Sequence, residues 1–446
     1  MRPAAAILAL AAFAGAARAD PCAPQQIRWL EDCSALAGQP LTGVDRLRYL
    51  AAGEGWVTMG GEARVRIERI DPADLGAAGG PSFLQVGRRA MLHADYHLSP
   101  DGPRVFGQVM ALGQDGRKPG PRAQDEDRFD IAQLFVEAPA RLGPATLRLR
   151  YGRQEVDLRN RLVNTRDGVT VRRTFQGPLA TLAVGGATLT AFRLHPTAPR
   201  RGVLDDRADR NETFEGVTLD GPAPLAGQAG LFLFERRRPA TRWLSSNAAE
   251  RRMSGGLRYA AETETWSLEA QATAQWGDAG AQSIRAFGLT ADAAWRVDAR
   301  HDVKVGPVMA YASGDGRPGD RRLGTFDPTY PSNNGVTDAP FLFQTNYLAL
   351  GGDGSFQVGP AELGLAGFRI TRASTGDAVY AQGRPVAGLS GGGRATARLV
   401  QLRARIRPTP HLEAYLSVTH AWVGDTVRAA GGRNATYARG QFTAYF

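Results

Sequence analysis

Apolar and polar residues alternate over long stretches of this chain. In the clearest stretch, every second residue from Trp266 to Trp276 is apolar, and the residues between them are polar or charged. A period of two is the pattern of a β-strand with two unlike faces. An apolar face with an aromatic residue at each end is typical of a strand that faces lipid between two aromatic girdles. A soluble sandwich strand can also alternate, but it is usually shorter.

The same alternation recurs along the chain. Further examples are residues 92–98, 287–296, 400–407 and 412–419. The chain ends on a short alternating stretch, residues 440–446, whose last residue is the aromatic Phe446. This ending resembles the assembly signal of bacterial outer-membrane proteins, so we expect the barrel-assembly machinery to be a partner through Phe446.

The segments between the predicted strands alternate in length. Short links are predicted at 99–103, 139–144, 261–263, 297–301, 357–360 and 408–410, and long polar segments at 113–128, 313–343, 373–393 and 423–437. Short periplasmic turns and longer outer loops are the rule in bacterial barrels. Backbone groups at membrane depth need partners within the protein, which only a closed sheet provides without helices. We therefore predict an all-β, transmembrane antiparallel β-barrel of about 18 strands.

The first residues predict export from the cytoplasm. Arg2, the apolar run 7–13 and the Ala17-Arg18-Ala19 site fit a signal peptide over residues 1–19. We expect a periplasmic segment over residues 20–55 and the barrel over 56–446, in the outer membrane of a Gram-negative bacterium. The only cysteines, Cys22 and Cys33, lie in the periplasmic segment. We expect them to form a disulfide there; two free thiols are the alternative.

Charge narrows the expected partners. The net charge is +10, and Lys118 and Lys304 are the only lysines among 54 basic residues. An exported chain does not meet nucleic acid, so we expect outer-membrane lipid, lipopolysaccharide and an anionic sugar polymer or small organic anion as partners.

Arginines recur on the polar faces of the predicted strands. Arg64 and Arg66 are two residues apart, as are Arg148 and Arg150, so each pair points to one side. The other arginines predicted on polar faces are Arg258, Arg296, Arg403, Arg405 and Arg439. Rings of arginine are how anion-selective pores are built. The alternative is that these arginines neutralise carboxylates on the same faces, among them Glu62, Asp95 and Glu269.

A charged segment, residues 152–177, carries Arg153, Arg172 and Arg173 among other charges. As an outer loop it either folds into the lumen and forms a constriction, or stays solvated near lipopolysaccharide phosphates. Both readings remain open from sequence.

Several motifs resemble the alginate export family. They are Tyr-Gly-Arg-Gln-Glu at 151–155, Asn-Arg-Leu-Val at 160–163, Arg-Asp-Gly-Val-Thr-Val-Arg-Arg-Thr-Phe-Gln-Gly at 166–177, Ala-Ser-Gly-Asp at 312–315, Gly-Thr-Phe-Asp-Pro-Thr-Tyr-Pro at 324–331 and Arg-Ala-Ser-Thr-Gly-Asp-Ala-Val-Tyr at 372–380. The similarity runs in order from about Trp56 to Phe446 and departs at Gln176, where the family often carries Asp. It implies an 18-stranded porin with an electropositive, arginine-lined pore that carries a polyuronate outward.

Other chemistry has weaker support. His97 and Ser99 have the spacing of a lipid hydrolase pair, but the alternation turns both toward the lumen, away from lipid. Asp315, Asp320 and Asp327 match no calcium loop and are explained by turn chemistry. We expect no cofactor, no metal and no catalysis. The predicted function is passive transport of an anionic solute, such as alginate; the alternatives are a general or nutrient-uptake anion porin and, less favoured, a lipid hydrolase.

Overall fold

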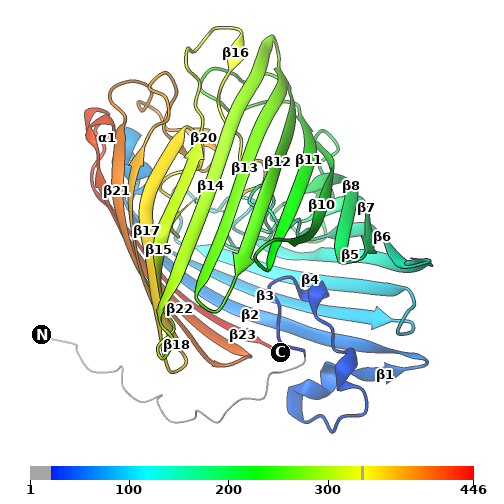
Figure 1. The fold of residues 1–446 in the computed structure, drawn as a ribbon. Helices are drawn as coiled ribbons and strands as arrows, with labels where there is room; N and C mark the ends of the chain where they lie inside the picture. Colours follow the sequence, from blue (N-terminus) through cyan, green and yellow to red (C-terminus); the bar gives the residue numbers. More distant parts are fainter. Residues whose placement is uncertain (1–21, 333–335) are drawn as a thin grey trace, which may run out of the picture.

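The computed structural model describes residues 22–332 and 336–446, and it forms one closed antiparallel β-barrel (Figure 1). The predicted signal peptide, residues 1–19, lies outside the described residues. The barrel strands are β2 (Gly55–Asp71), β3 (Phe83–His97), β4 (Arg104–Asp115), β5 (Asp127–Leu142), β6 (Ala145–Gln154), β7 (Phe175–Val184), β8 (Ala187–Ala198), β10 (Thr213–Ala223), β11 (Gly227–Arg238), β12 (Glu250–Glu262), β13 (Trp266–Ala279), β14 (Gln282–Asp298), β15 (Val303–Ala312), β17 (Tyr347–Val358), β18 (Ala361–Thr371), β21 (Ala395–Thr409), β22 (Leu412–Val423) and β23 (Ala435–Tyr445). They number 18, so the prediction is confirmed.

The barrel closes where its last strand meets its first. β23 pairs with β22 on one side and with β2 on the other, in register from Glu62 opposite Tyr445 to Asp71 opposite Thr436. The backbone of Phe446 continues this pairing, because its N–H and C=O both bond Gly61. Closure gives the strands of the wall hydrogen-bond partners on both sides, as the hydrocarbon core of a membrane requires.

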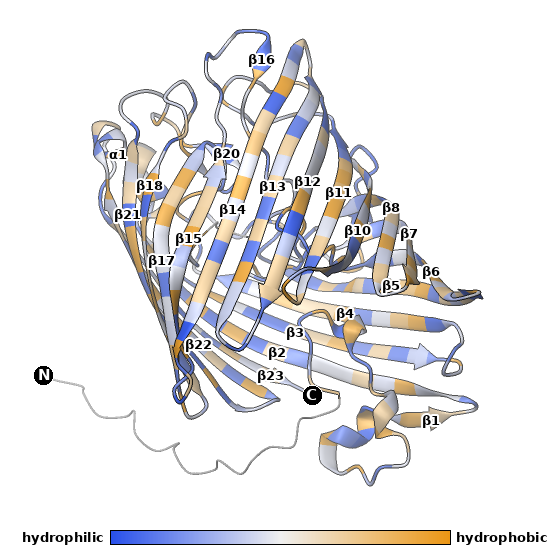
Figure 2. Ribbon diagram, in the orientation of Figure 1, coloured by the Kyte–Doolittle hydropathy of each residue, from blue (hydrophilic) through white to orange (hydrophobic). Residues whose placement is uncertain are grey.

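Apolar and polar residues alternate along the strands (Figure 2), and the two faces of the wall differ as that alternation predicts. On β2, Val65 and Ile67 are 46% and 48% exposed, whereas Arg64 and Arg66 are 4% and 3% exposed. Apolar side chains outside and charged side chains inside is the reverse of a soluble protein and suits a barrel in lipid. Trp276, near the outer end of β13, is also exposed to the outside.

The connections alternate in length, with one exception. On the periplasmic side, β7 and β8 are joined by residues 185–186 alone, and β17 and β18 by 359–360. Long outer connections include residues 155–174 and 313–346. The outer connection between β13 and β14 has only residues 280–281, so these two strands rise as a plain hairpin.

The remaining elements are short. They are the 3-10 turns η1 (Arg28–Leu30), η2 (Ser34–Leu36), η3 (Gly43–Leu47) and η4 (Ala73–Gly79), the strands β1 (Leu50–Ala52), β9 (Arg207–Ala208), β16 (Arg322–Leu323), β19 (Tyr380–Ala381) and β20 (Arg384–Pro385), and the helix α1 (Asp425–Ala429). Among the described residues, no helix is long and apolar enough to span a bilayer.

The segment before the barrel enters the lumen from the periplasmic side. Cys22 and Cys33 are joined by a disulfide that closes this segment into a loop. Arg28 donates from Nη2 to the carbonyl oxygen of Phe446 at 3.1 Å, and Trp29 donates from Nε1 to the carbonyl oxygen of Glu155 at 3.1 Å. The segment therefore contacts both the seam of the barrel and the beginning of the outer connection 155–174.

Candidate functional site: a constricted lumen

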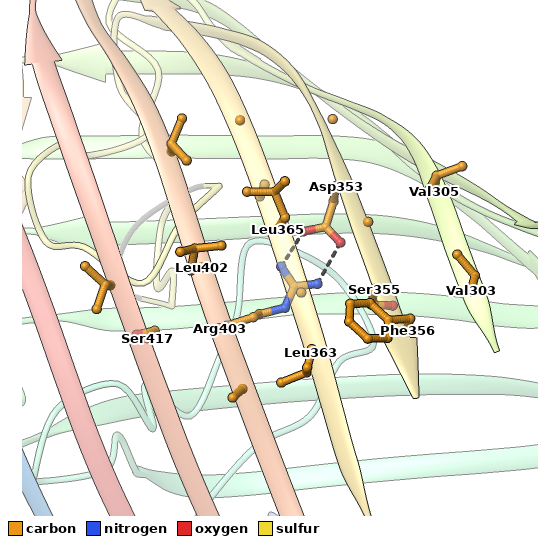
Figure 3. Close-up of a pocket in the computed structure, with 18 of the residues that line it drawn as sticks. Val303, Val305, Asp353, Ser355, Phe356, Leu363, Leu365, Leu402, Arg403 and Ser417 are labelled. Carbon is orange, nitrogen blue, oxygen red and sulfur yellow. Dashed lines mark hydrogen bonds and ion pairs between the residues drawn. The ribbon is translucent and has the colours of Figure 1, made fainter. Parts of the chain in front are cut away.

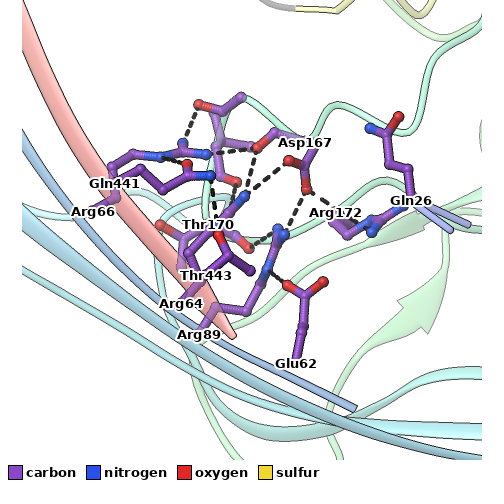
Figure 4. Close-up of polar contacts among 12 residues, drawn as sticks. Gln26, Glu62, Arg64, Arg66, Arg89, Asp167, Thr170, Arg172, Gln441 and Thr443 are labelled. Carbon is purple, nitrogen blue, oxygen red and sulfur yellow. Dashed lines mark hydrogen bonds and ion pairs between the residues drawn. The ribbon is translucent and has the colours of Figure 1, made fainter. Parts of the chain in front are cut away.

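The outer connection 155–174, called the inner loop below, lies inside the barrel. At one end, Asp167 meets the wall arginines of β2 and β3 (Figure 4). Arg64 donates from Nη1 to Asp167 Oδ2 at 2.9 Å, and Arg89 donates from Nη2 to Asp167 Oδ1 at 2.6 Å. Burial alone would raise the pKa of Asp167, but the guanidinium groups, Arg64 foremost, outweigh it and hold that pKa well below its usual value.

Backbone carbonyl groups strengthen this attachment. Arg66 donates to the carbonyl oxygens of Gly168 at 2.7 Å and Asp167 at 2.9 Å, and Arg64 donates to that of Val169 at 3.1 Å. The sequence analysis placed Arg64 and Arg66 on the lumen side, and the structure adds that the inner loop covers both. Arg89 was not singled out, although it shares the face of His93 and Asp95 and could have been found by the same alternation.

The other end of the inner loop is bound across the lumen. The backbone N–H of Arg161 donates to Gln271 Oε1 at 2.8 Å, and its guanidinium forms ion pairs with Glu269 and Asp292. These partners lie on β13 and β14, the eleventh and twelfth strands of the 18, whereas Arg64 and Arg89 lie on the first and second. The inner loop therefore crosses the barrel from one side to the opposite one.

A second outer connection, 313–346, descends onto the inner loop. Its Tyr330 exchanges backbone hydrogen bonds with the inner loop, accepting from Asn164 N at 2.9 Å and donating to the carbonyl oxygen of Leu162 at 2.8 Å. The Tyr330 ring packs edge-on against Phe175 and Phe214, with ring centroids 5.0 and 4.9 Å apart. The two connections thus form one unit that narrows the lumen.

Two cavities lie on either side of this unit, and Pro331 and Ser332 line both. The outer cavity has a volume of about 500 Å³, and the periplasmic cavity about 1100 Å³. Seven arginines and six carboxylates line the outer cavity: Arg117, Arg122, Arg166, Arg173, Arg236, Arg238, Arg242, Glu68, Asp125, Asp209, Glu212, Asp327 and Asp338. Four basic and five acidic residues line the periplasmic one: Arg159, Arg161, Arg258, Lys304, Asp157, Glu262, Glu269, Asp292 and Asp353. The positive surplus is therefore confined to the outer cavity.

Among the described residues, the guanidinium groups of two inner-loop arginines have only neutral hydrogen-bond partners. Arg173 donates to the carbonyl oxygens of Asn164 at 2.9 Å and Pro331 at 3.1 Å. Arg166 donates to Gln124 Oε1 at 3.1 Å and to the carbonyl oxygen of Val171 at 3.3 Å. Burial first, and then a neighbouring arginine, lowers the pKa of Arg166 to about 10 and that of Arg173 well below its usual value. Guanidinium groups keep their proton in proteins, so these two positive charges are poorly compensated.

The arginines predicted on β6 and in the segment after it have different surroundings. Arg150 donates from Nε to Glu137 Oε2 at 2.8 Å, and Arg172 pairs with Glu155 at 2.7 Å. Arg153 pairs with Asp130 at 3.1 Å. Arg148 is exposed and lines a cavity of about 570 Å³ beneath the N-terminal segment, at the periplasmic mouth.

The remaining predicted arginines lie on strands between β12 and β23. Arg258 pairs with Glu269 at 3.2 Å, and Arg296 with Asp302 at 2.6 Å. Arg405 Nε lies 3.6 Å from Glu413 Oε2, and Arg439 Nη1 lies 4.0 Å from Asp338 Oδ1. The structure therefore gives most of the predicted arginines a carboxylate neighbour, as the structural alternative proposed.

The Arg403 side chain crosses a neighbouring strand at a glycine. It reaches from β21 across β18 to form a bidentate ion pair with Asp353 on β17 (Figure 3). Gly364 lies beneath it, and a Cβ atom there would be 2.6 Å from Arg403 Cζ. The hollow in Figure 3 is lined mainly by outward-facing apolar side chains such as Leu365 and Leu402, so it belongs to the lipid side of the wall.

The other candidate residues contact neighbouring side chains. The His97 ring stacks on Trp56 with centroids 4.3 Å apart, and its Nε2 lies 3.2 Å from Asp95 Oδ2. Asp315 accepts a hydrogen bond from Ser245, whereas Asp327 pairs with Arg236. Asp315 and Asp327 thus have separate structural partners.

Comparison with known proteins agrees with this architecture. The alginate export family matches residues 55–441. A BenF-like porin from Pseudomonas fluorescens superimposes with a TM-score of 0.58 at 11% identity, over 87% of this chain and 98% of that one. Pseudomonas aeruginosa OpdF, solved in complex with glucuronate, gives 0.55 at 12% identity, over 89% and 99%. Pseudomonas aeruginosa OpdK, solved with vanillate, gives 0.54 at 11% identity, over 87% and 98%.

No curated protein sequence matches this chain. At such low identity the solved structures establish the fold, and the family match covers most of the chain. The chain therefore belongs to the alginate export family and is an outer-membrane β-barrel channel of a Gram-negative bacterium.

Proposed function

We propose that this channel conducts anionic, carboxylate-bearing solutes, and that an acidic polysaccharide such as alginate is its cargo. The observation that carries the proposal is the pair Arg166 and Arg173, whose guanidinium groups bind neutral groups beside the outer cavity. A carboxylate that enters this cavity meets two guanidinium groups that form no ion pair with any carboxylate of the described residues. Guanidinium groups bind carboxylates in a bidentate geometry and do not lose their proton.

Passage needs contacts that are weak and replaceable. The arginines around the outer cavity are interleaved with carboxylates, so an anion exchanges one guanidinium for the next and is not trapped. The periplasmic cavity, with one more acidic than basic residue in its lining, offers no comparable attraction. Recognition therefore belongs to the outer half of the lumen and to the constriction.

Uptake of small organic anions is the second candidate. It is favoured by the constriction itself, because the inner loop and the 313–346 connection leave an outer cavity of only about 500 Å³. Two of the similar structures were solved with glucuronate and with vanillate, which are small carboxylates, and this also favours small organic anions as the cargo. Acidic polysaccharides and small organic anions both present carboxylates to the channel, and they differ in the length of the molecule.

The test is selectivity in planar bilayers with Arg166→Gln and Arg173→Gln combined. Each lost charge weakens attraction for an anion at contact distance by about 1 kcal/mol even at the dielectric constant of water, which is roughly fivefold. We expect the double variant to lose most of the preference for chloride over potassium. Arg317→Gln, an exposed arginine of connection 313–346, is the matched control and should leave it unchanged.

Blocking experiments separate the two cargo classes. Alginate oligomers added on the periplasmic side should interrupt the wild-type current, and neutral oligosaccharides of equal length should not. Block by vanillate or glucuronate alone would favour uptake of small anions. Equal selectivity in the wild-type channel and in the double variant would refute the assignment of Arg166 and Arg173.

A further inference from the structure

Three aspartates from distant parts of the chain meet at the outer end of β5. Asp127 and Asp130 stand at the start of that strand, and Asp206 belongs to the outer connection 199–212 between β8 and β10. Carboxylate oxygens of all three lie within 4.8 Å of one another, and all three side chains are buried. The connection is held to the strand nearby, because the Leu204 N–H donates to the carbonyl oxygen of Phe129 at 2.9 Å.

Two of these carboxylates have hydrogen-bond partners. Asp130 accepts from Arg153 Nη1 at 3.1 Å and from the Asp206 N–H at 2.9 Å. Asp206 accepts from the Arg200 N–H through Oδ1 at 2.6 Å. Arg153 is thus the one guanidinium that the described residues bring to these three carboxylates by an ion pair.

Asp127 has none. Its side chain is 0% exposed, and neither oxygen has a hydrogen bond of acceptable geometry with any described residue. A buried carboxylate without a partner is strongly unfavourable unless a cation or a proton compensates it. Asp205, directly before Asp206, adds another buried oxygen without a hydrogen bond. The surplus of negative charge and the free oxygens point to a bound cation.

We propose that Asp127, Asp130 and Asp206 are ligands of a calcium ion that fastens the connection 199–212 to β5. Calcium prefers several oxygen ligands in flexible geometry, which carboxylates from a strand end and a loop can supply. Magnesium demands a tighter octahedral arrangement and keeps much of its water, so it should compete weakly. The position at the outer rim exposes the site to external calcium, where protein sites typically bind with Kd of about 10⁻⁴–10⁻³ M.

Limited trypsin digestion of the refolded full-length protein in detergent tests this proposal. The connection contains Arg200, Arg201, Arg207 and Arg210, so cleavage there reports whether it is fastened. We expect 5 mM calcium to slow cleavage at these sites at least tenfold relative to EDTA, and 5 mM magnesium to have a much smaller effect. A cleavage rate in the wild-type protein that does not depend on calcium would overturn the proposal.

Asp127→Asn sharpens the test. This variant should lose the response to calcium, and in EDTA its connection should resist trypsin better than that of the wild type, because the repulsion between carboxylates is reduced. Asp320→Asn, an exposed aspartate of another outer connection, is the control and should respond to calcium as the wild type does. An Asp127→Asn protein with an undiminished calcium response would refute the assignment.

A direct measurement of calcium binding to the wild-type protein does not require the variant to fold. Equilibrium dialysis of the wild-type protein with radioactive calcium should show one ion bound per chain at millimolar concentration. No binding up to 10 mM would contradict the proposal.

Discussion

Replacing Asp167 by asparagine tests whether the inner loop is fastened as the contacts indicate. The change keeps the shape of the side chain but removes the negative charge that Arg64 and Arg89 both bind. Glu62 still pairs with Arg89 in the variant, whereas Arg64 is left without a carboxylate partner. The bonds from Arg64 and Arg66 to the loop carbonyl groups remain, so the loop should loosen and not detach completely.

The expected cost follows from burial. Removing one partner of a buried ion pair costs about 3–5 kcal/mol. The Asp167 side chain keeps 28% of its surface exposed, so we take the lower limit, about 3 kcal/mol. That corresponds to roughly a hundredfold rise in the undocked fraction of the loop.

Hydrogen–deuterium exchange followed by mass spectrometry measures this fraction. Peptides from residues 155–174 should exchange about a hundredfold faster in Asp167→Asn, and peptides from the barrel strands should not change. Asp157→Asn is the matched control, because Asp157 lies on the same loop, is exposed, and accepts a hydrogen bond only from its neighbour Arg159 among the described contacts. Exchange within about threefold of the wild type in Asp167→Asn would refute the claim that this carboxylate holds the loop.

Two further predictions follow from the same constriction. Burial, which outweighs the Arg172 guanidinium, raises the pKa of Glu155 to about 7 from 4.5. Because the folded pKa is the higher one, the docked loop loses stability as pH rises from about 4.5 to 7. The protection of residues 155–174, after correction for the intrinsic base-catalysed exchange rate, should therefore fall over that window in the wild type and stay level in Glu155→Gln. Phe214→Ala empties a fully buried site among Phe175, Phe192, Phe234 and Tyr330 and should lower the free energy of unfolding by about 3–5 kcal/mol in urea titration. A loss below 1 kcal/mol, or no more than that of the outward-facing Phe287→Ala, would contradict the role of this aromatic cluster.

The architecture could be predicted from sequence because its cause is local. Whether a side chain faces lipid or lumen depends on its parity along the strand, and in the outer halves of β13 and β21 exposure alternates with that parity. The same rule placed Arg64 and Arg66 inside. It also applied to Arg89, which shares the face of His93 and Asp95.

From sequence the constriction was one of two open readings of residues 152–177, because the choice between them depends on distant partners. The sequence shows the charges of residues 152–177 but not that Asp167 meets β2 and β3 while Arg161 meets β13 and β14. It shows Asp127 and Asp206 without indicating that a 79-residue separation closes to within 4.8 Å. Pairing with carboxylates likewise depends on which strands become neighbours, so the sequence left neutralisation of the arginines as an alternative and could not assign their partners.

The most direct test of anion conduction is the reversal potential of the unmodified channel. Purified protein in a planar bilayer between unequal potassium chloride solutions should give a potential whose sign shows chloride to be more permeant than potassium. A potential of the opposite sign, with potassium more permeant, would contradict the proposed function.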